Sequence, residues 1–450
     1  MTKQLTHGSP LKLILAFTMP LLVGNIFQQL YSMADTLIVG RILGVHSLAA
    51  VGSTGSLSFF ILGFVQGFTT GLAITVANRF GAGDYAGLKK SVSTAIIISG
   101  VVTVVLTFIS VFFCRQLLEL MQTPAEIIDD AYLYVVIIFA GTVANVIFNL
   151  FSNIIRALGD SKIPLIFLII ACILNIVLDI LFIGKVGLGV EGAAIATVIS
   201  QLVSGILCVI YIGKKLPVIH IRKQDWKVSR AELLQQSKIA FPMGFQMSII
   251  AIGAIILQYV LNGLGAISVA AFTAAQKIDQ IAGQPMNSFG TTMATYTAQN
   301  YGAGKIDRIR KGVNQCIIFS GSFSLIIGLI NILFGSSLTG LFVGGDATQV
   351  MDLSHTYLII NGSMYWVLAL LFIYRFTIQG LGKSFTPTLA GIMELIMRTA
   401  AAVFLATKFG FAGAAWASPL AWIGAVIPLA IDYYLNIRRL KLKENEGLAT

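Results

Sequence analysis

The stretch LKLILAFTMPLLVGNIFQQLYSMADTLIVGR, residues 11–41, decides how the rest of the chain is interpreted. It is an apolar run long enough to cross a bilayer, since a transmembrane helix needs about 20 such residues. Within it stand an acid, Asp35, and a helix breaker, Pro20. An ionisable group inside a span costs about 2.5–3.5 kcal/mol on insertion scales, so we expect Asp35 to have a partner or a function. Pro20 removes a backbone donor and predicts a hinge in the same helix.

The composition is that of a polytopic membrane protein. Of the 450 residues 56% are hydrophobic and 11% are charged, and the mean hydropathy is +0.87. Soluble domains carry about a quarter charged residues. The net charge of +11 would suggest a nucleic-acid partner in a soluble protein. Here the basic residues fall in short loops, where membrane topology explains them, so we expect no nucleic-acid partner. The polar start leads into a span with no small-residue cleavage site, which predicts an uncleaved first helix.

The apolar runs predict an all-α membrane protein with twelve transmembrane helices. The predicted spans are 12–40, 46–78, 90–113, 127–157, 161–184, 190–213, 231–262, 267–300, 311–334, 347–379, 384–407 and 411–438. Lys and Arg gather in the even-numbered loops and at both ends of the chain, while the odd-numbered loops hold only Arg41, Arg115, Lys185 and Lys408. This asymmetry predicts a multi-pass protein of the cell (inner) membrane with both termini in the cytoplasm.

The chain is also an internal duplication. NRFGAGDYAGLKKS (78–91) matches QNYGAGKIDRIRKG (299–312) at an offset of 221, and LGVHSLAAVG (43–52) matches LGAISVAAFT (264–273) at the same offset. Pro20 is echoed by Pro242. Each half holds six predicted helices, so both halves insert the same way up, as in transporters built from parallel repeats. We therefore expect two pseudo-symmetric lobes, 1–213 and 231–450, joined by a cytoplasmic linker, 214–230, around a central cavity.

The sequence lacks motifs for nucleotide binding, metal binding or catalysis. GLGKS (380–384) resembles the end of a phosphate-binding loop, but Thr377 stands where that pattern needs glycine. The histidines fall at predicted ends or loops, and the scattered cysteines have no metal-ligand spacing. We therefore predict neither an enzyme nor an organic cofactor, and energy must come from an ion gradient.

Polar residues inside the first-half spans converge on one depth. Asp35 lies six residues before Arg41, Asp179 six before Lys185, and Thr197 six after Glu191. At 1.5 Å per residue each is about 9 Å below the outer boundary.

Asn175 lies one helical turn from Asp179 on the same face, and Asn153 ends a stripe of asparagines at four-residue spacing. Oxygen ligands with two carboxylates suit H⁺ or Na⁺, with Asp35 and Asp179 as the Na⁺ ligands in a sodium-coupled protein. The alternative is that these groups only hydrogen-bond helices together.

The second half does not copy this set. Asp35 maps onto the region of Gln258, and the ionisable groups are elsewhere. The candidate polar residues of a substrate cavity in this half are Gln258, Lys277, Asp279, Glu394 and Arg398, with Arg375 nearby on the tenth span. For Glu394 and Arg398, which stand at i,i+4, an ion pair within one helix is the alternative to a cavity role.

Across nearly the whole chain these residues resemble the multidrug and toxic compound extrusion (MATE) family. The resemblance lies in the twelve spans, the Pro20–Asp35 helix, the two GAG loops and LNIVLDILFI in the fifth span, and it points to the DinF-like branch of the multidrug/oligosaccharidyl-lipid/polysaccharide exporter superfamily. It implies an outward-open V and a helix that bends at Pro20 when Asp35 is protonated. It also implies a first-half cation site formed by Asp35, Asn153, Asn175, Asp179 and Thr197.

We therefore predict a secondary antiporter that exports cationic, amphipathic drugs or metabolites in exchange for Na⁺ or H⁺ by alternating access. We expect a monomer whose other partners are membrane lipids. The rival hypothesis is a lipid-linked oligosaccharide flippase of the same superfamily, which needs a basic cavity, and Lys277, Arg375 and Arg398 keep it open. A passive pore or a membrane enzyme is a third alternative.

Overall fold

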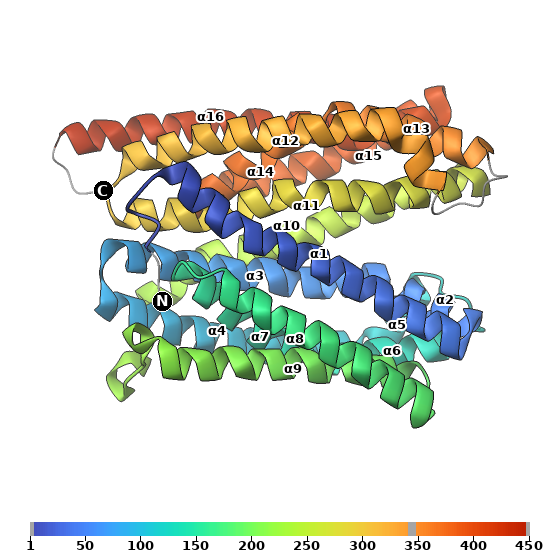
Figure 1. Cartoon of the computed structure of the whole chain (residues 1–450), viewed down its shortest axis with the longest axis horizontal. Coiled ribbons are helices and arrows are strands. Elements are labelled where there is room, and N and C mark those ends of the chain that lie inside the picture. The colour runs from blue at the N-terminus through green and yellow to red at the C-terminus, as the bar shows by residue number, and fades with distance from the viewer. Residues whose placement is uncertain (1–3, 341–347, 447–450) are drawn as a thin grey trace. The chain divides into compact units, whose positions relative to one another are not determined.

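The computed structural model describes residues 4–340 and 348–446, and every regular element in these ranges is a helix (Figure 1). Contacts divide the chain into two compact units. The first is formed mainly by Val23–Ser248, and the second by Leu5–Leu22 with the chain from Ile249 onward. The division therefore falls inside α1 and α10, two residues after Pro20 and six after Pro242. The predicted lobes 1–213 and 231–450 and the hinge at Pro20 stay predictions.

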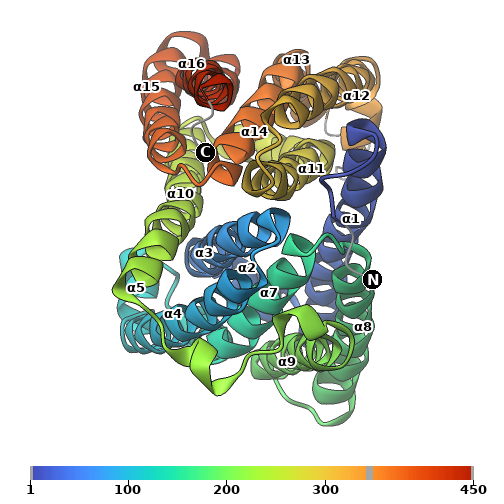
Figure 2. The same cartoon turned by 90° about the vertical axis from the view of Figure 1, so that its left-hand side faces the viewer.

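The first unit contains the latter part of α1 and the helices up to α10. Their bounds are α1 Pro10–Leu43, α2 Val45–Ser53, α3 Gly55–Ala82, α4 Tyr85–Phe112, α5 Cys114–Leu120, α6 Ile128–Ala140, α7 Thr142–Ala157, α8 Lys162–Asp179, η1 Ile180–Lys185, α9 Val190–Lys215, η2 Pro217–Ile219, η3 Lys223–Trp226 and α10 Arg230–Gly263. Within this unit α7 packs between α3 and α9, and α8 lies beside α9 (Figure 2).

The second unit contains the first part of α1, the end of α10 and six further helices. These six are α11 Ala266–Gly302, α12 Ile306–Gly340, α13 Thr348–Ser363, α14 Tyr365–Gly380, α15 Phe385–Ala415 and α16 Ala417–Asn445. Here α11 packs against α14 and α12, and α15 packs along α16. An apolar core that includes Met286, Met293, Tyr365 and Trp422 fills the space between these helices.

The all-α prediction is confirmed, and the described helices refine the predicted spans. Nine of them are long and apolar enough to cross a membrane, and two bent pairs raise the number to eleven. The predicted spans 127–157 and 347–379 are these pairs, α6–α7 and α13–α14, bent by 46° and 49°, and position 347 lies outside the described residues. The predicted span 267–300 forms as α11, but it is not among the nine apolar helices, because its many Thr, Gln and Asn residues lower its mean hydropathy.

Backbone geometry supports the duplication. Turn glycines with positive φ recur 221 or 223 residues apart: Gly44 and Gly265 (φ 89° and 96°) and Gly83 and Gly304 (72° and 68°) at 221, and Gly159 and Gly382 (86° and 76°) and Gly187 and Gly410 (78° and 56°) at 223. A left-handed φ is strained for residues with a Cβ, so glycine is the residue that lets each turn form. The Gly410 turn breaks the long element α15, which explains the predicted end of a span near 407.

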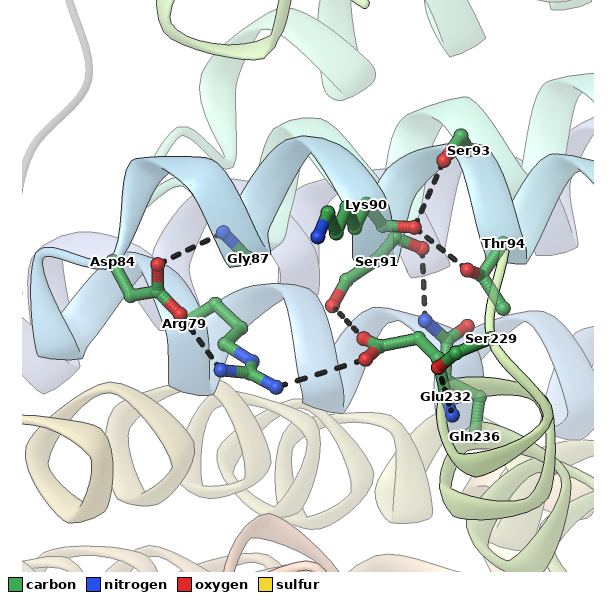
Figure 3. Close-up of polar contacts among 10 residues, drawn as sticks. All are labelled: Arg79, Asp84, Gly87, Lys90, Ser91, Ser93, Thr94, Ser229, Glu232 and Gln236. Atoms are coloured by element: carbon green, nitrogen blue, oxygen red, sulfur yellow. Dashed lines mark hydrogen bonds and ion pairs between the residues drawn. The ribbon is translucent and has the colours of Figure 1, made fainter. Parts of the chain in front are cut away.

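The GAG corner of the first repeat holds the start of α10 (Figure 3). Asp84 caps α4 by accepting a hydrogen bond from the Gly87 N–H at 2.8 Å, and it pairs with Arg79 at 2.7 Å. The Gly87 N–H and then Arg79 hold the pKa of Asp84 below its usual value. From α10, Glu232 accepts a hydrogen bond from the Ser91 hydroxyl at 2.8 Å and lies 3.7 Å from Arg79. The corner therefore fixes the first turn of α10 to α3 and α4.

The matching corner of the second repeat holds the residues that lead into α1. The Arg308 guanidinium donates to the Gly8 carbonyl at 2.8 Å, and the Lys305 ammonium donates to the Thr6 carbonyl at 2.9 Å. The Gln299 side chain accepts from the Leu5 N–H at 2.8 Å. In each repeat, the corner thus anchors the start of the helix that opens the other repeat.

Close helix packing gives a test of this fold. A Cβ at Gly71 of α3 would lie 2.6 Å from the Ala240 Cα of α10, so Gly71→Val must push the two backbones apart. We expect a loss of about 1–3 kcal/mol in unfolding free energy, seen as a lower Tm in detergent. The matched control is Gly100→Val, at an exposed position with no neighbouring atom within 4 Å. Equal Tm values for the two variants would contradict this packing.

Candidate functional site

Two buried acids meet in the first unit. Asp35 of α1 is 8% exposed, Asp179 at the end of α8 is 0% exposed, and the two carboxyl groups lie close enough to interact with each other. An ionised carboxylate only accepts hydrogen bonds, so a bond between two carboxyl groups needs one proton between them. The pairing expected from their matched depth is therefore present in the structure.

Local backbone geometry places Asp179 at a break in the helix. It is the last residue of α8, after which the chain continues as the π-helical turn η1, Ile180–Lys185. Single π-helical turns are rare and occur often at functional sites. Here the wider turn follows directly after the buried acid.

A chain of donors leads to Asp179 from two other residues. With its amide oriented to satisfy its neighbours, Asn175 donates to Asp179 Oδ2 at 2.8 Å and accepts from the Thr197 N–H and hydroxyl at 3.2 and 3.3 Å. The Tyr31 hydroxyl in turn donates to Thr197 Oγ1 at 3.1 Å. Asn175, Asp179 and Thr197 thus form one network with Asp35.

Two tyrosines of this site were not predicted. Tyr31 lies one turn before Asp35 on α1, so i,i+4 spacing was a signal that could have found it. Tyr134 of α6 interacts electrostatically with Asp35 and Asp179, and a lone tyrosine in an apolar helix carries no sequence signal. Of the two, Tyr31 is joined to the network by a hydrogen bond, through Thr197, and Tyr134 interacts with the pair electrostatically.

One oxygen of each carboxyl group in the pair has no hydrogen-bond partner. Asp35 Oδ1 and Asp179 Oδ1 are buried and have no hydrogen-bond partner. Buried polar atoms are nearly always satisfied, so such atoms call for an explanation. Among the described residues no group of three or more His, Cys, Asp or Glu could hold a metal ion. The two unpartnered oxygens are therefore available to a proton or a cation.

Asn153 lies apart from this network in its contacts. Its amide donates to the Thr69 and Thr70 hydroxyls at 3.2 and 3.3 Å, and it accepts from Arg156 at 3.2 Å. Asn153 is four residues from the end of α7, about 6 Å along the axis, and α8 begins five residues after that end. Asp179 is the last residue of α8, a full helix length away. Its predicted place beside the carboxyl pair is thus not supported by its contacts, because a four-residue stripe fixes a face but not a depth.

The second unit holds a different cluster, in which two arginines share one acid. Glu394 accepts from Arg375 at 2.7 Å and from Arg398 at 2.9 Å, and all three are less than 10% exposed. The i,i+4 pair was an expected alternative to a cavity role. The bond from Arg375 on α14 ties it to a second helix.

Asp279 belongs to this cluster, whereas Lys277 and Gln258 make no contact with it that the structure records. Asp279 Oδ1 accepts from the Tyr365 hydroxyl at 2.6 Å and interacts electrostatically with Arg398. Lys277 is exposed, and Gln258 donates to Asn262 on its own helix at 2.9 Å. Two arginines and two acids balance formally, so the described cluster does not offer the surplus positive charge that a pyrophosphate-lipid flippase needs.

Comparisons with known proteins agree with this fold. A family model described as MatE matches residues 20–181 and 242–404. The "Probable multidrug resistance protein YpnP" of Bacillus subtilis is 30% identical over 306 residues, 68% of each chain. The "Multidrug export protein MepA" of Staphylococcus saprophyticus is 22% identical over 448 residues, 98% of this chain and 97% of that protein.

A solved structure shares the same fold. The outward-facing conformation of a multidrug resistance MATE family transporter of the MOP superfamily superposes with a TM-score of 0.90. It is 24% identical, and the match covers 97% of this chain and 98% of that one. At this identity the likeness shows the fold alone.

The arginine–glutamate cluster makes a stability prediction. Glu394→Gln removes the ion-pair partner of both buried guanidinium groups and leaves Asp279 as the one acid that interacts with Arg398, so we expect a loss of about 3–5 kcal/mol, measured as a large drop in Tm. The control is Glu119→Gln, whose pair with Arg115 is about half exposed and should cost under about 1 kcal/mol. A Glu394→Gln Tm within a degree or so of the control would show that the arginines have another counter-charge.

Proposed function

We propose, since this chain belongs to the MATE family, that it exports amphipathic cations across the cell membrane in exchange for H⁺ or Na⁺ moving inward. The coarser statement is established by the family: the chain is a multi-pass multidrug efflux transporter and not an enzyme. The coupling ion and the cationic character of the substrate are the parts that we propose.

The observation that carries the proposal is that two buried acids, Asp35 and Asp179, meet in the first unit. We propose that the pair shares one proton in a hydrogen bond when it is loaded. Loss of that proton leaves two buried negative charges side by side, which repel unless a cation replaces it. One pair can therefore exist in a cation-loaded and an unloaded state, with different forces between α1 and α8.

Coupling follows when drug and ion favour different states. A ligand that binds both conformations equally shifts nothing, however tightly it binds. We propose that loading the Asp35–Asp179 pair favours the conformation that binds drug poorly, and that Pro20 is the hinge at which α1 responds. Pro20 is about 22 Å from Asp35 along the axis, so hinge and sensor are separate parts.

The donor network favours H⁺ as the ion in the state described. The Asn175 and Thr197 oxygens already accept hydrogen bonds, which leaves the two carboxyl oxygens free. Sodium entry needs these amide and hydroxyl groups to turn toward the ion, whereas a proton needs no rearrangement. Na⁺ remains the alternative, and imposed gradients of each ion separate the two.

The orientation of the chain is part of the same proposal. The excess of Lys and Arg in even-numbered loops supports cytoplasmic termini. We propose a monomer, with no resident cofactor besides the coupling ion.

The function is tested with everted membrane vesicles that accumulate a cationic dye under an imposed pH or Na⁺ gradient. Asp35→Asn removes one partner of the shared proton, so we expect gradient-driven accumulation to fall by at least about tenfold. The control is Glu126→Gln, an exposed acid outside the predicted spans, which should transport as the wild type does. Wild-type accumulation by Asp35→Asn under both gradients would refute the proposed coupling site.

A further inference from the structure

We propose that the linker, residues 214–230, binds the head groups of anionic phospholipids through its exposed face. This inference does not depend on the coupling ion or on the exported substrate. It is argued from the way the linker is folded, from its charges and from one exposed tryptophan.

The linker is a folded strip docked on α4. Two short 3₁₀ turns, Pro217–Ile219 and Lys223–Trp226, both contact α4. Leu216 and Ile219 are each 2% exposed, so one side of the strip is buried against the protein. A strip held in this way presents its other side in a fixed arrangement.

Hydrogen bonds hold the second half of the strip and the start of α10 that follows it. The Ser93 hydroxyl of α4 donates to the Asp225 carbonyl at 2.6 Å, and the Asp225 carboxylate accepts from the Arg222 N–H at 2.7 Å. Where the linker enters α10, Gln236 donates to the Ser91 carbonyl at 2.9 Å (Figure 3). The single acid of the linker, Asp225, is thereby turned inward and is 6% exposed.

The exposed side carries only positive charge. Six basic side chains lie on it, all exposed, and no ion pair joins any of them to a described acid: Lys214, Lys215, Arg222, Lys223, Lys227 and Arg230. Four to eight cations directly beside a transmembrane helix are the pattern that recognises anionic lipid head groups. Because the backbone of the linker is already folded, little backbone entropy is lost when phosphates bind.

An exposed indole stands among these cations. Trp226 is 46% exposed, although its ring could have been buried like Leu216. The linker connects two helices that are long and apolar enough to span a membrane, α9 ending at Lys215 and α10 beginning at Arg230. Tryptophan favours the interface between head groups and acyl chains. The positive charge that favours a cytoplasmic loop explains the Lys and Arg residues of the linker. It does not explain why the linker is folded against α4 or why Trp226 is exposed.

The direct test measures lipid affinity of the purified full chain in detergent. Short-chain phosphatidylglycerol and phosphatidylcholine are titrated separately, and binding is read by native mass spectrometry. The triple variant Lys223→Gln, Lys227→Gln, Arg230→Gln should bind phosphatidylglycerol about tenfold more weakly or worse, with phosphatidylcholine unchanged. The charge-keeping variant Lys223→Arg, Lys227→Arg, Arg230→Lys should retain wild-type affinity.

The matched control removes the same charge from another exposed basic group. Arg438→Gln, Arg439→Gln, Lys443→Gln, at the end of α16, should leave phosphatidylglycerol affinity within about threefold. Equal losses in both triple variants would overturn the proposal, because any cytoplasmic cation would then serve. Unchanged affinity in the linker variant, or displacement of the lipid by inorganic phosphate at equal concentration, would overturn it as well.

The wild type alone gives a second test that needs no variant to fold. If the cations of the linker hold the lipid, phosphatidylglycerol affinity must fall as NaCl is raised, since salt screens exposed charges. Phosphatidylcholine affinity should not change. A phosphatidylglycerol affinity that is independent of salt would contradict the proposal.

Discussion

The meeting of Asp35 and Asp179 is the interaction on which the proposed coupling depends. It brings two buried acids of α1 and α8 together, and a hydrogen bond between them requires one proton. Asn175 donates to Asp179, Thr197 donates to Asn175, and Tyr31 donates to Thr197, so a chain of donors ends on the acid pair. A change of one proton therefore alters the force between two helices, and one of them continues into the second unit.

The two repeats share a scaffold and differ in chemistry. Their turns coincide, as the paired positive-φ glycines Gly83 and Gly304 illustrate. Their ionisable groups do not: the first repeat has an acid pair with open oxygens, and the second has Glu394 fixed between two arginines. A cluster whose two arginines are matched by Glu394 and Asp279 is suited to holding helices together, while an acid pair with two unpartnered oxygens is suited to exchanging a cation.

The sequence was informative wherever a local rule applies. Spans follow from hydropathy, turns follow from glycine, and the meeting of Asp35 with Asp179 followed from counting residues to the nearest loop charge. The sequence was less informative about contacts that depend on the direction in which a side chain points from its helix. The bonds of Asn153 to Thr69 and Thr70, the approach of Tyr134 and the reach of Arg375 to Glu394 depend on how helices rotate and bend. The 46° bend between α6 and α7 lies within a continuous apolar run, which hydropathy alone does not resolve.

The central claim is that one proton is shared between Asp35 and Asp179. The most direct measurement is the infrared difference spectrum between the purified wild type and the double variant Asp35→Asn, Asp179→Asn at neutral pH. The account predicts a band for the C=O stretch of one protonated carboxyl group, shifted in D₂O, that the double variant lacks. A difference spectrum with no protonated-carboxyl band would contradict the account, because the pair would then hold no proton.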